Sequence, residues 1–288
     1  MSLHPEKRAA VLAEALPYLK QYNGEIVVVK YGGNAMIDEE LKQAVIEDVL
    51  MLHLVGIHVV LVHGGGPDIN AMLNKTGVKS HFVNGLRFTD EDTMEIVQMV
   101  LCGKVNKDLV AKLDGKGIGL SGMDGNLFQA VGLQDGKYNY GYVGDIKKVN
   151  SDLVKDVIEK GYIPVISSVA TGLTDLHAYN VNADTAASKL AGALHAKKLI
   201  LLTDIAGLLS DPDDPESVIP SIRVSQIPAL TNTGVISGGM IPKVECCVEA
   251  VRQGVPHASI IDGRIPHSIL IELLTNAGIG TMFSQEEI

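Results

Sequence analysis

The chain has 288 residues, enough for one large α/β domain or two smaller lobes with a substantial core. Its 34 acidic residues outnumber the 24 Lys and Arg, and this net charge of −10 argues against sequence-independent nucleic-acid binding, which needs clustered cations. Mean hydropathy is high at +0.20. The apolar runs, such as Ile26–Val29, Val59–Val62 and Leu199–Leu202, are nevertheless much shorter than the roughly 20 residues of a membrane-spanning helix.

The cysteines and the N-terminal residues indicate the compartment. There are three cysteines, Cys102, Cys246 and Cys247, and an odd number with two adjacent argues against a disulfide scaffold. The first residues contain no uninterrupted apolar stretch of the signal-peptide type. We therefore predict a cytoplasmic protein that binds neither membranes nor nucleic acid.

The first predicted element is an amphipathic helix over Glu6–Leu19. Its apolar face consists of Val11, Leu12, Ala15, Leu16 and Leu19. Helical periodicity leaves two interpretations open: a helix packed on its own domain, or an arm that packs on another subunit.

Short β-branched strands then alternate with helices. The predicted strands are Glu25–Tyr31, His58–Val62, Gly117–Leu120, Tyr162–Ile166, Lys198–Thr203 and Ala258–Ile261. The predicted helices are a segment from Met36 to Leu52, Asp90–Leu101, Asp152–Lys160, Ala183–Leu194 and Met240–Gln253. Such alternation builds parallel βαβ units, so we predict an α/β fold with helices on both faces of one sheet.

Two segments interrupt this alternation. Ser121–Asn150 is rich in glycine and contains three tyrosines, and it predicts a β-hairpin insertion. Ser210–Ser217 is acidic and contains two prolines, which indicates a solvated loop. A seam near Leu194–Lys197 divides an N-terminal lobe from a C-terminal one.

Glycine loops follow the first two predicted strands, with Gly32 and Gly33 in one and Gly64, Gly65 and Gly66 in the other. Both loops should face the crevice outside the carboxyl ends of parallel strands. Glycines let backbone N–H groups approach an anion closely, and a helix beginning near residue 67 adds its positive end. Neither loop has the dinucleotide or Walker A spacing. One glycine run alone is more often a tight turn, but two on neighbouring strand ends favour a phosphate or carboxylate cradle.

Three cations stand near such loops. Lys30 ends an apolar strand, where a lysine either extends into water or points into the crevice. Lys243 opens a helix, where a cation is electrostatically disfavoured unless a polyphosphate balances it. Arg87 follows a turn and is suited to bind a carboxylate bidentately, although a surface arginine is the commoner outcome.

Polar residues also gather before a predicted helix and after a predicted strand. Asn180, Asn182 and Asp184 precede the helix, where Asn182 is a good N-cap. Thr203 and Asp204 end a strand and are followed by two further crevice candidates, Gly207 and Leu208.

No cysteine, histidine or serine pattern supports zinc or nucleophilic chemistry, and His63 beside a glycine loop is interpreted as a hydrogen-bonded structural residue. Lysines and glycine loops without a catalytic base suit phosphoryl transfer, in which the protein positions groups and neutralises charge. A carboxylate acceptor is already ionised at neutral pH and needs no general base.

The chain contains, in this order, VVVKYGGNAM, VLVHGGGPDIN, NGLRFT, GLSGMDGNL, NVNADTAASKLA, LLTDIAGLL and GGMIPKV. Together these segments resemble the amino acid kinase family from about Leu12 to Phe283. NGLR and NVNAD favour the branch of that family that acts on N-acetylglutamate over those acting on aspartate, carbamate, uridylate or glutamate.

The resemblance implies a three-layer αβα sandwich around a mainly parallel open sheet. It also implies an N-terminal helical arm for oligomerisation over residues 1–22, an N-lobe with the amino-acid and phosphoryl sites over 23–195, and a C-lobe with the ATP site over 196–288. The implied activity is ATP-dependent phosphorylation of the γ-carboxylate of N-acetyl-L-glutamate in arginine biosynthesis. Mg²⁺ should arrive on the ATP phosphates, because no dedicated carboxylate cage is visible.

Matched position by position, Lys30 and Lys243 stabilise the transferring phosphoryl group and Asp184 orients them. The implied substrate contacts are Gly65, Gly66, Arg87 and Asn180, beside a phosphate loop of Gly32, Gly33 and Gly64. The implied nucleotide contacts are Thr203, Asp204, Gly207, Leu208 and Lys243.

The two ends of the chain resemble the arginine-inhibited branch, in which N-terminal helices interlace dimers into a hexamer. Glu272 and Gly278 match its effector positions. Ser259 stands where many members carry histidine, and His257 lies two residues away. In some lineages such proteins also bind a nitrogen-signalling protein. Two alternatives stay open: a non-catalytic arginine-binding sensor of the same fold, and a kinase acting on another carboxylate.

Overall fold

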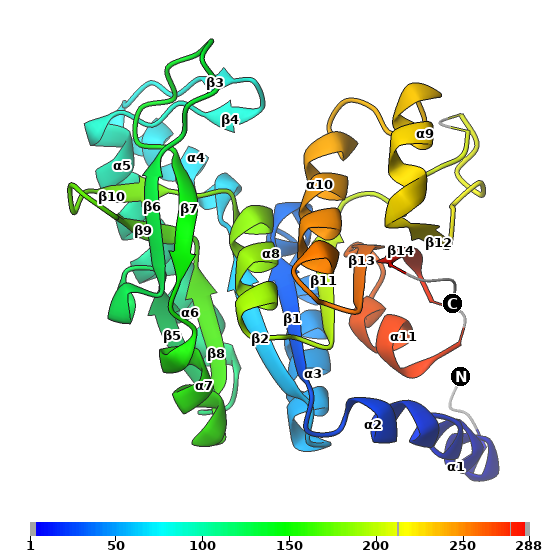
Figure 1. Ribbon diagram of the computed structural model, residues 1–288. Coiled ribbons are helices and arrows are strands. Elements are labelled where there is room, and N and C mark those ends of the chain that lie inside the picture. Colours follow the sequence, from blue (N-terminus) through cyan, green and yellow to red (C-terminus); the bar gives the residue numbers. More distant parts are fainter. Residues whose placement is uncertain (1–3, 212, 277, 286–288) are drawn as a thin grey trace.

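The computed structural model describes residues 4–211, 213–276 and 278–285, and Figure 1 shows its arrangement. One eight-stranded sheet runs through the molecule in the order β12-β14-β13-β11-β1-β2-β8-β5. Its strands are β1 (Ile26–Tyr31), β2 (His58–His63), β5 (Gly117–Ser121), β8 (Ile163–Ser167), β11 (Lys198–Thr203), β12 (Ser221–Arg223), β13 (His257–Asp262) and β14 (Gly280–Ser284). Neighbours pair in parallel except β13 with β14, so the predicted mainly parallel sheet is confirmed.

Both faces of this sheet are buried, because alternate side chains of each central strand enter two different cores. Val28 of β1 packs with the helices of one layer, whereas Val27 and Val29 pack with those of the other. The first layer contains α7 (Asp152–Glu159), α8 (Ala183–Ala193) and α10 (Met240–Arg252). The second contains α3 (Glu39–Leu54), α4 (Gly66–Thr76), α5 (Glu91–Gln98), α6 (Asn106–Lys112) and α11 (Ser268–Leu274). The three-layer sandwich is confirmed.

The predicted hairpin insertion is confirmed as β6 (Phe128–Gly132) and β7 (Gly144–Val149), which pair antiparallel. It belongs to a larger four-stranded sheet that also contains β9 (Val169–Gly172) and β10 (Ala178–Asn180). These two strands, like the two-residue strands β3 (Phe82–Val83) and β4 (Leu86–Arg87), are too short to show a periodic pattern.

Three helical predictions need correction. The helix predicted over 6–19 is two helices, α1 (Pro5–Glu14) and α2 (Leu16–Tyr22), because Pro17 has no N–H to continue the hydrogen-bond ladder. The helix predicted from Met36 begins later, at Glu39, where the Asp38 carboxylate caps it; Gly33–Met36 is a 3₁₀ turn. The helix predicted to end at Leu101 continues through a π-helical segment, Met99–Val105, into α6.

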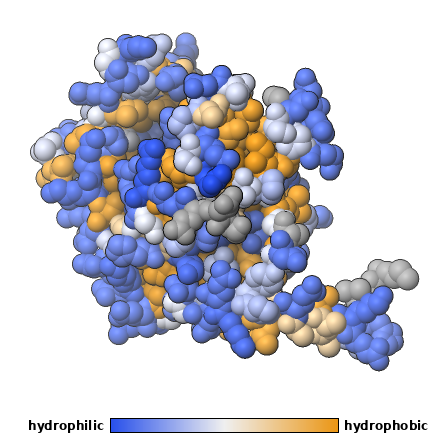
Figure 2. Space-filling model, turned by 45° about the vertical axis from the view of Figure 1, so that its right-hand side comes forward, coloured by the Kyte–Doolittle hydropathy of each residue, from blue (hydrophilic) through white to orange (hydrophobic). Residues whose placement is uncertain are grey.

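The N-terminal helices lie apart from the rest of the molecule. In Figure 1, α1 extends away from the body at the lower right. Val11 and Leu12 are 56% and 66% exposed, whereas Tyr22 of α2 is buried against the core. In Figure 2 this arm projects from the lower right and carries apolar beside polar surface. The predicted apolar face is therefore largely uncovered in the single chain, and residues 1–3 of the predicted arm lie outside the described residues.

The remaining predictions concern boundaries. The acidic loop is exposed at residues 210, 211 and 213–216 and half-buried at Ser217, and it precedes β12 and the helix α9 (Ile227–Asn232). The predicted seam near Leu194–Lys197 directly precedes β11. The N–H of Lys197 donates to the carbonyl of Ile26, and β11 pairs with β1, so the sheet continues across this point. The division into lobes stays a prediction. None of the described helices has the length and apolarity needed to cross a membrane.

Candidate active site

The carboxyl ends of β1 and β2 bring the two glycine loops together. Tyr31 lies opposite His63 in the parallel register, and the N–H of Gly64 donates to the carbonyl of Tyr31 at 3.1 Å. Gly32 lies close to Lys30: a Cβ there would be 3.0 Å from the lysine Nζ, so a side chain at this position would press on the lysine. Gly33 has φ +75°, in the left-handed region that glycine favours.

Three charged residues from three separate elements meet beside these loops. The Nζ of Lys30, on β1, lies 2.8 Å from Oδ1 of Asp184, in the first turn of α8. The Nζ of Lys243, on α10, lies 3.4 Å from Oδ2 of the same carboxylate. Burial alone would raise the pKa of Asp184, but the two lysines outweigh burial and hold this pKa below its usual value. The carboxylate is therefore ionised and forms ion pairs with both lysines, an arrangement suited to orienting them.

A cavity of about 200 Å³ opens next to this cluster. Its lining contains the predicted substrate residues Gly65, Gly66, Arg87 and Asn180, together with Gly64 of the predicted phosphate loop. Apolar side chains of Ile69, Leu86, Leu101 and Val143 complete much of its lining. A pocket with a few convergent polar groups among apolar ones suits a small polar molecule with an apolar substituent.

Arg87 is buried and held in place at the cavity. Its guanidinium donates to Oδ1 of Asn70 at 2.7 Å and to Oγ of Ser80 at 2.8 Å, and it lies 4.9 Å from the centre of the Phe82 ring. Burial lowers the pKa of Arg87. Asn70, Ser80 and Phe82 are uncharged, so the positive charge of Arg87 is left to attract an anion. The sequence offered no signal for these three partners, which lie in α4, in the loop after it and in β3.

The asparagines have different roles. The Nδ2 of Asn180 donates to Thr89 Oγ1 at 3.1 Å. Its side-chain oxygen Oδ1 can then accept a hydrogen bond from a ligand in the cavity. Asn182 Oδ1 accepts from the N–H groups of Asp184 and Thr185 at 2.8 and 3.2 Å, so the predicted N-cap is confirmed.

The predicted nucleotide residues lie at the end of β11 and line no part of this cavity. Thr203 Oγ1 donates within its own turn, to the carbonyl of Ile205 at 3.2 Å. The N–H of Leu208 donates to Thr281 Oγ1, and a Cβ at Gly207 would lie 2.8 Å from that hydroxyl oxygen. Asp204 is exposed at the same strand end. These residues form a second region beside the lysine cluster.

The predicted effector residues lie near the amino end of β11, the opposite end of this strand from Thr203. Lys198, at the amino end of β11, pairs with Glu272 of α11 at 2.7 Å, and both side chains are buried. The other oxygen of Glu272 accepts from Ile279 N–H at 3.2 Å and faces Gly278, which has φ +63°. His257 Nδ1 and Ser259 Oγ are buried nearby on β13 without a hydrogen-bond partner among the described residues.

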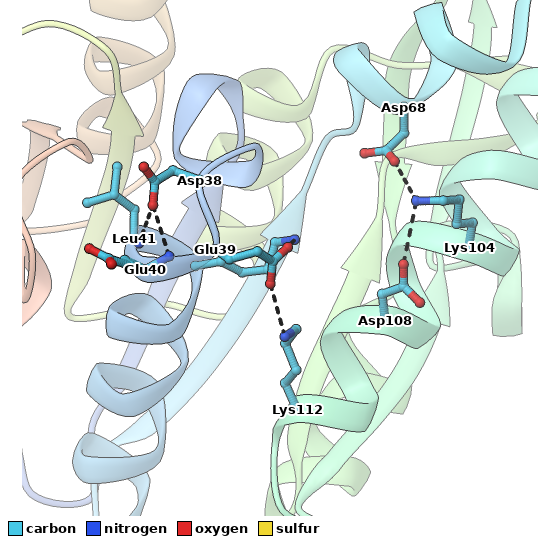
Figure 3. Close-up of polar contacts among 9 residues, drawn as sticks. Asp38, Glu39, Glu40, Leu41, Asp68, Lys104, Asp108 and Lys112 are labelled. Atoms are coloured by element: carbon cyan, nitrogen blue, oxygen red, sulfur yellow. Dashed lines mark hydrogen bonds and ion pairs between the residues drawn. The ribbon is translucent and has the colours of Figure 1, made fainter.

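The π-helical segment and α6 are tied to neighbouring helices by ion pairs, as Figure 3 shows. Lys104 bridges Asp68, in the first turn of α4, at 2.5 Å and Asp108 at 3.6 Å. Lys112 pairs with Glu39 of α3 at 3.3 Å. These exposed pairs surround a depression of about 310 Å³ outside the predicted site.

Comparison with known proteins now defines the class. The sequence model of the amino acid kinase family matches residues 25–262, and the chain belongs to this family. The chain is 56% identical to the acetylglutamate kinase of Clostridium beijerinckii over 97% of this chain and 99% of that protein. It is 54% identical to the acetylglutamate kinase of Heliobacterium modesticaldum, covering 96% and 97% of the two chains.

Solved structures share the fold. N-acetylglutamate synthase of Neisseria gonorrhoeae, complexed with coenzyme A and N-acetyl-glutamate, matches with a TM-score of 0.82 and 26% identity over 97% of this chain. The chain spans 64% of the length of that synthase. The protein smu.665 of Streptococcus mutans matches with a TM-score of 0.72 and 31% identity, covering 91% of this chain and 99% of that one.

Proposed function

We propose that this chain transfers the γ-phosphoryl group of ATP to the γ-carboxylate of N-acetyl-L-glutamate, giving N-acetyl-L-glutamyl 5-phosphate and ADP. The observation that carries the proposal is the Lys30–Asp184–Lys243 cluster beside a cavity that contains Arg87 and the glycine loops. The names of the relatives above 50% identity support the same substrate.

Each group has a role that follows from its position. Arg87 binds the α-carboxylate of the substrate, because it is a buried cation with neutral partners at the cavity wall. Asn180 and the apolar lining hold the N-acetyl group. The acceptor γ-carboxylate then points toward Lys30, where it attacks as an anion without a base. Lys30 and Lys243 neutralise the charge on the phosphoryl oxygens during transfer.

The nucleotide occupies the region of Thr203, Asp204, Gly207 and Leu208, at the carboxyl end of β11 next to β1. Among the described residues, no group of three or more His, Cys, Asp or Glu side chains could hold a metal ion. Both oxygens of Asp184 already face lysines. The residues present therefore fit a Mg²⁺ ion that is carried by the ATP phosphates, whose charge it would partly neutralise.

The decisive experiment traps the acyl phosphate with hydroxylamine. N-acetyl-L-glutamate, glutamate, aspartate, carbamate and UMP are offered separately with ATP and Mg²⁺, and each product is quantified. We expect hydroxamate from N-acetyl-L-glutamate and ADP formation that depends on it. Product from glutamate but not from its N-acetyl derivative would contradict the proposal.

We infer further that arginine inhibits this reaction by binding at Glu272 and Gly278. A carboxylate is a good partner for a guanidinium, and the unpartnered polar atoms of His257 and Ser259 lie nearby. Lys198 already occupies one oxygen of Glu272, so arginine must share or displace this lysine. Arginine should inhibit the wild type but not Glu272→Gln, whose uninhibited turnover serves as the control. Equal inhibition of both would remove Glu272 from the effector site.

A further inference from the structure

His63 is a buried histidine that the proposed chemistry does not use. It ends β2 directly before the glycine loop, and its side chain is fully buried. Its Nδ1 lies 2.9 Å from the carbonyl oxygen of Gly64. A carbonyl oxygen can only accept, so Nδ1 carries the proton and Nε2 is left as an acceptor.

Asn106, the first residue of α6, fixes this tautomer. Its Nδ2 lies 3.0 Å from His63 Nε2 and also donates to the carbonyl of Val165 at 2.9 Å. The orientation of this amide is set from the other side, because Lys107 Nζ donates to Asn106 Oδ1 at 3.1 Å. Burial lowers the pKa of His63 to about 4, and the charge of Lys107 acts in the same direction, so the imidazole is neutral at neutral pH.

The contact with Gly64 determines where the next N–H group points. The carbonyl of Gly64 and the N–H of Gly65 belong to one planar trans peptide, so they point in opposite directions. Since the carbonyl faces the buried ring of His63, the N–H of Gly65 faces the other way, toward the cavity that Gly64 and Gly65 line. Gly65 is also the N-cap of α4, whose first N–H groups have no partner inside the helix.

The packing around Gly65 leaves this peptide little freedom. The N–H of Gly64 is bonded to Tyr31, and a Cβ at Gly65 would lie 2.7 Å from Leu101 and 3.2 Å from Val105 of the π-helical segment. The same segment is tied to the first turn of α4 by Lys104 and Asp68. The hydrogen bond before this peptide and the close side chains of Leu101 and Val105 after it thus restrict its rotation.

We propose that His63 is a positioning residue: through its Nδ1–H bond to Gly64, and with its tautomer set by Asn106, it aims the Gly65 N–H at the oxygen that gains charge during phosphoryl transfer. This inference rests on the proposed function. A preorganised N–H donor of this kind acts on the transition state more than on the bound substrate. Its effect should therefore appear in kcat and not in KM.

Two variants separate the two ring nitrogens. In His63→Asn the side-chain amide can take the place of Nδ1–H and keep a donor for Gly64. In His63→Gln the amide reaches the position of Nε2, so it keeps the contact with Asn106 and loses the donor to Gly64. His58→Gln, at the other end of the same strand, is the matched control.

We expect His63→Gln to lower kcat by roughly 10–100-fold with the KM for N-acetyl-L-glutamate changed less than about 2-fold, and His63→Asn to stay within about 3-fold of the wild type. Retained kcat in both variants, or equal loss in both with intact folding by circular dichroism, would overturn the proposal. Absence of any product from the wild type would instead reject the proposed function.

If His63→Gln does not fold, a measurement of the His63 tautomer in the wild type tests the proposal. In ¹⁵N-histidine-labelled protein at neutral pH, the His63 signal, identified by its loss in His63→Asn, should show a protonated Nδ1 and an unprotonated Nε2. The opposite tautomer, or a doubly protonated ring, would overturn the proposal, because neither leaves Asn106 its acceptor.

Discussion

At the scale of single residues, Asp184 forms ion pairs with both Lys30 and Lys243. Substitution of Lys243 therefore tests the mechanism directly, because the other ion pair remains. Lys243→Ala removes one of two cations that face the transferring phosphoryl group, while Lys30 still pairs with Asp184. We expect kcat to fall by at least about 100-fold, the scale of losing one preorganised charge contact. Steady-state assays at saturating ATP and N-acetyl-L-glutamate measure it.

The control for this substitution is Lys189→Ala. Lys189 pairs with Glu249 at 2.9 Å and so joins the same two helices, α8 and α10, but at a more exposed position. Near-normal turnover is expected for this control. If Lys243→Ala were equally active, Lys243 would have no part in phosphoryl transfer.

His63 also predicts a pH dependence of stability. Its pKa is lowered in the folded protein from 6.5 to about 4, so the unfolded chain binds a proton between these values that the folded chain does not. The free energy of unfolding should therefore fall as the pH drops through this window, by about 3 kcal/mol at its acid end. Urea unfolding of wild type and His63→Asn at several pH values isolates the effect, since the variant lacks the titrating group. Parallel pH curves for the two proteins would contradict it.

At the scale of single residues, the sequence predicted which residues belong to the site better than it predicted the side chains that contact them. Lys30, Asp184 and Lys243 were identifiable because each follows a strand end or opens a helix in an unusual place. Asn70, Ser80 and Phe82 were not, because their contacts with Arg87 depend on how α4 and the β3–β4 hairpin approach each other. No local pattern encodes that approach.

At the scale of secondary structure, Asn182 links helix stability to the site. Its side chain caps α8, whose first turn contains Asp184. Asn182→Ala should lower the free energy of unfolding by about 1 kcal/mol, whereas Asn182→Ser should recover most of it, because serine is also a good N-cap. Urea denaturation measures both. Equal stability of the alanine and serine variants would show that the cap contributes little.

The cap was predictable, since Asn before a helix is a local signal. The π-helical segment was not, because apolar periodicity continues through it while its hydrogen bonds change. This is why the helix end predicted at Leu101 was wrong, and why the contact of Asn106 with His63 could not be foreseen.

At the scale of the whole molecule, the exposed arm predicts an oligomer. Val11 and Leu12 expose a large part of their surface on α1, which suits burial against a second copy of the chain. We expect the arm to join dimers into a hexamer, so removing residues 1–22 should leave dimers, and Leu12→Asp should weaken the same contact. Light scattering measures the number of subunits in each case. Leu54→Asp, an exposed leucine outside the arm, is the control, and an unchanged number of subunits after the deletion would show that the arm takes no part in assembly.

The main sheet was largely predictable because its central strands are continuous apolar runs, each followed by a helix. The smaller sheet was predicted only as a hairpin. Its strands β9 and β10 follow β8 without a helix between them, so the βαβ rhythm gave no sign of them.

The π-helical segment restricts how the length of this chain can change. In a π-helix each N–H bonds to the carbonyl five residues back and not four, so deleting one residue from Met99–Val105 would let the segment return to α geometry. The widened turns that now set the position at which α6 begins would be lost. Asn106 would then leave His63, although every side chain of the site would still be present in the sequence. Among related chains, we therefore expect substitutions in this segment to be common and gaps to be rare.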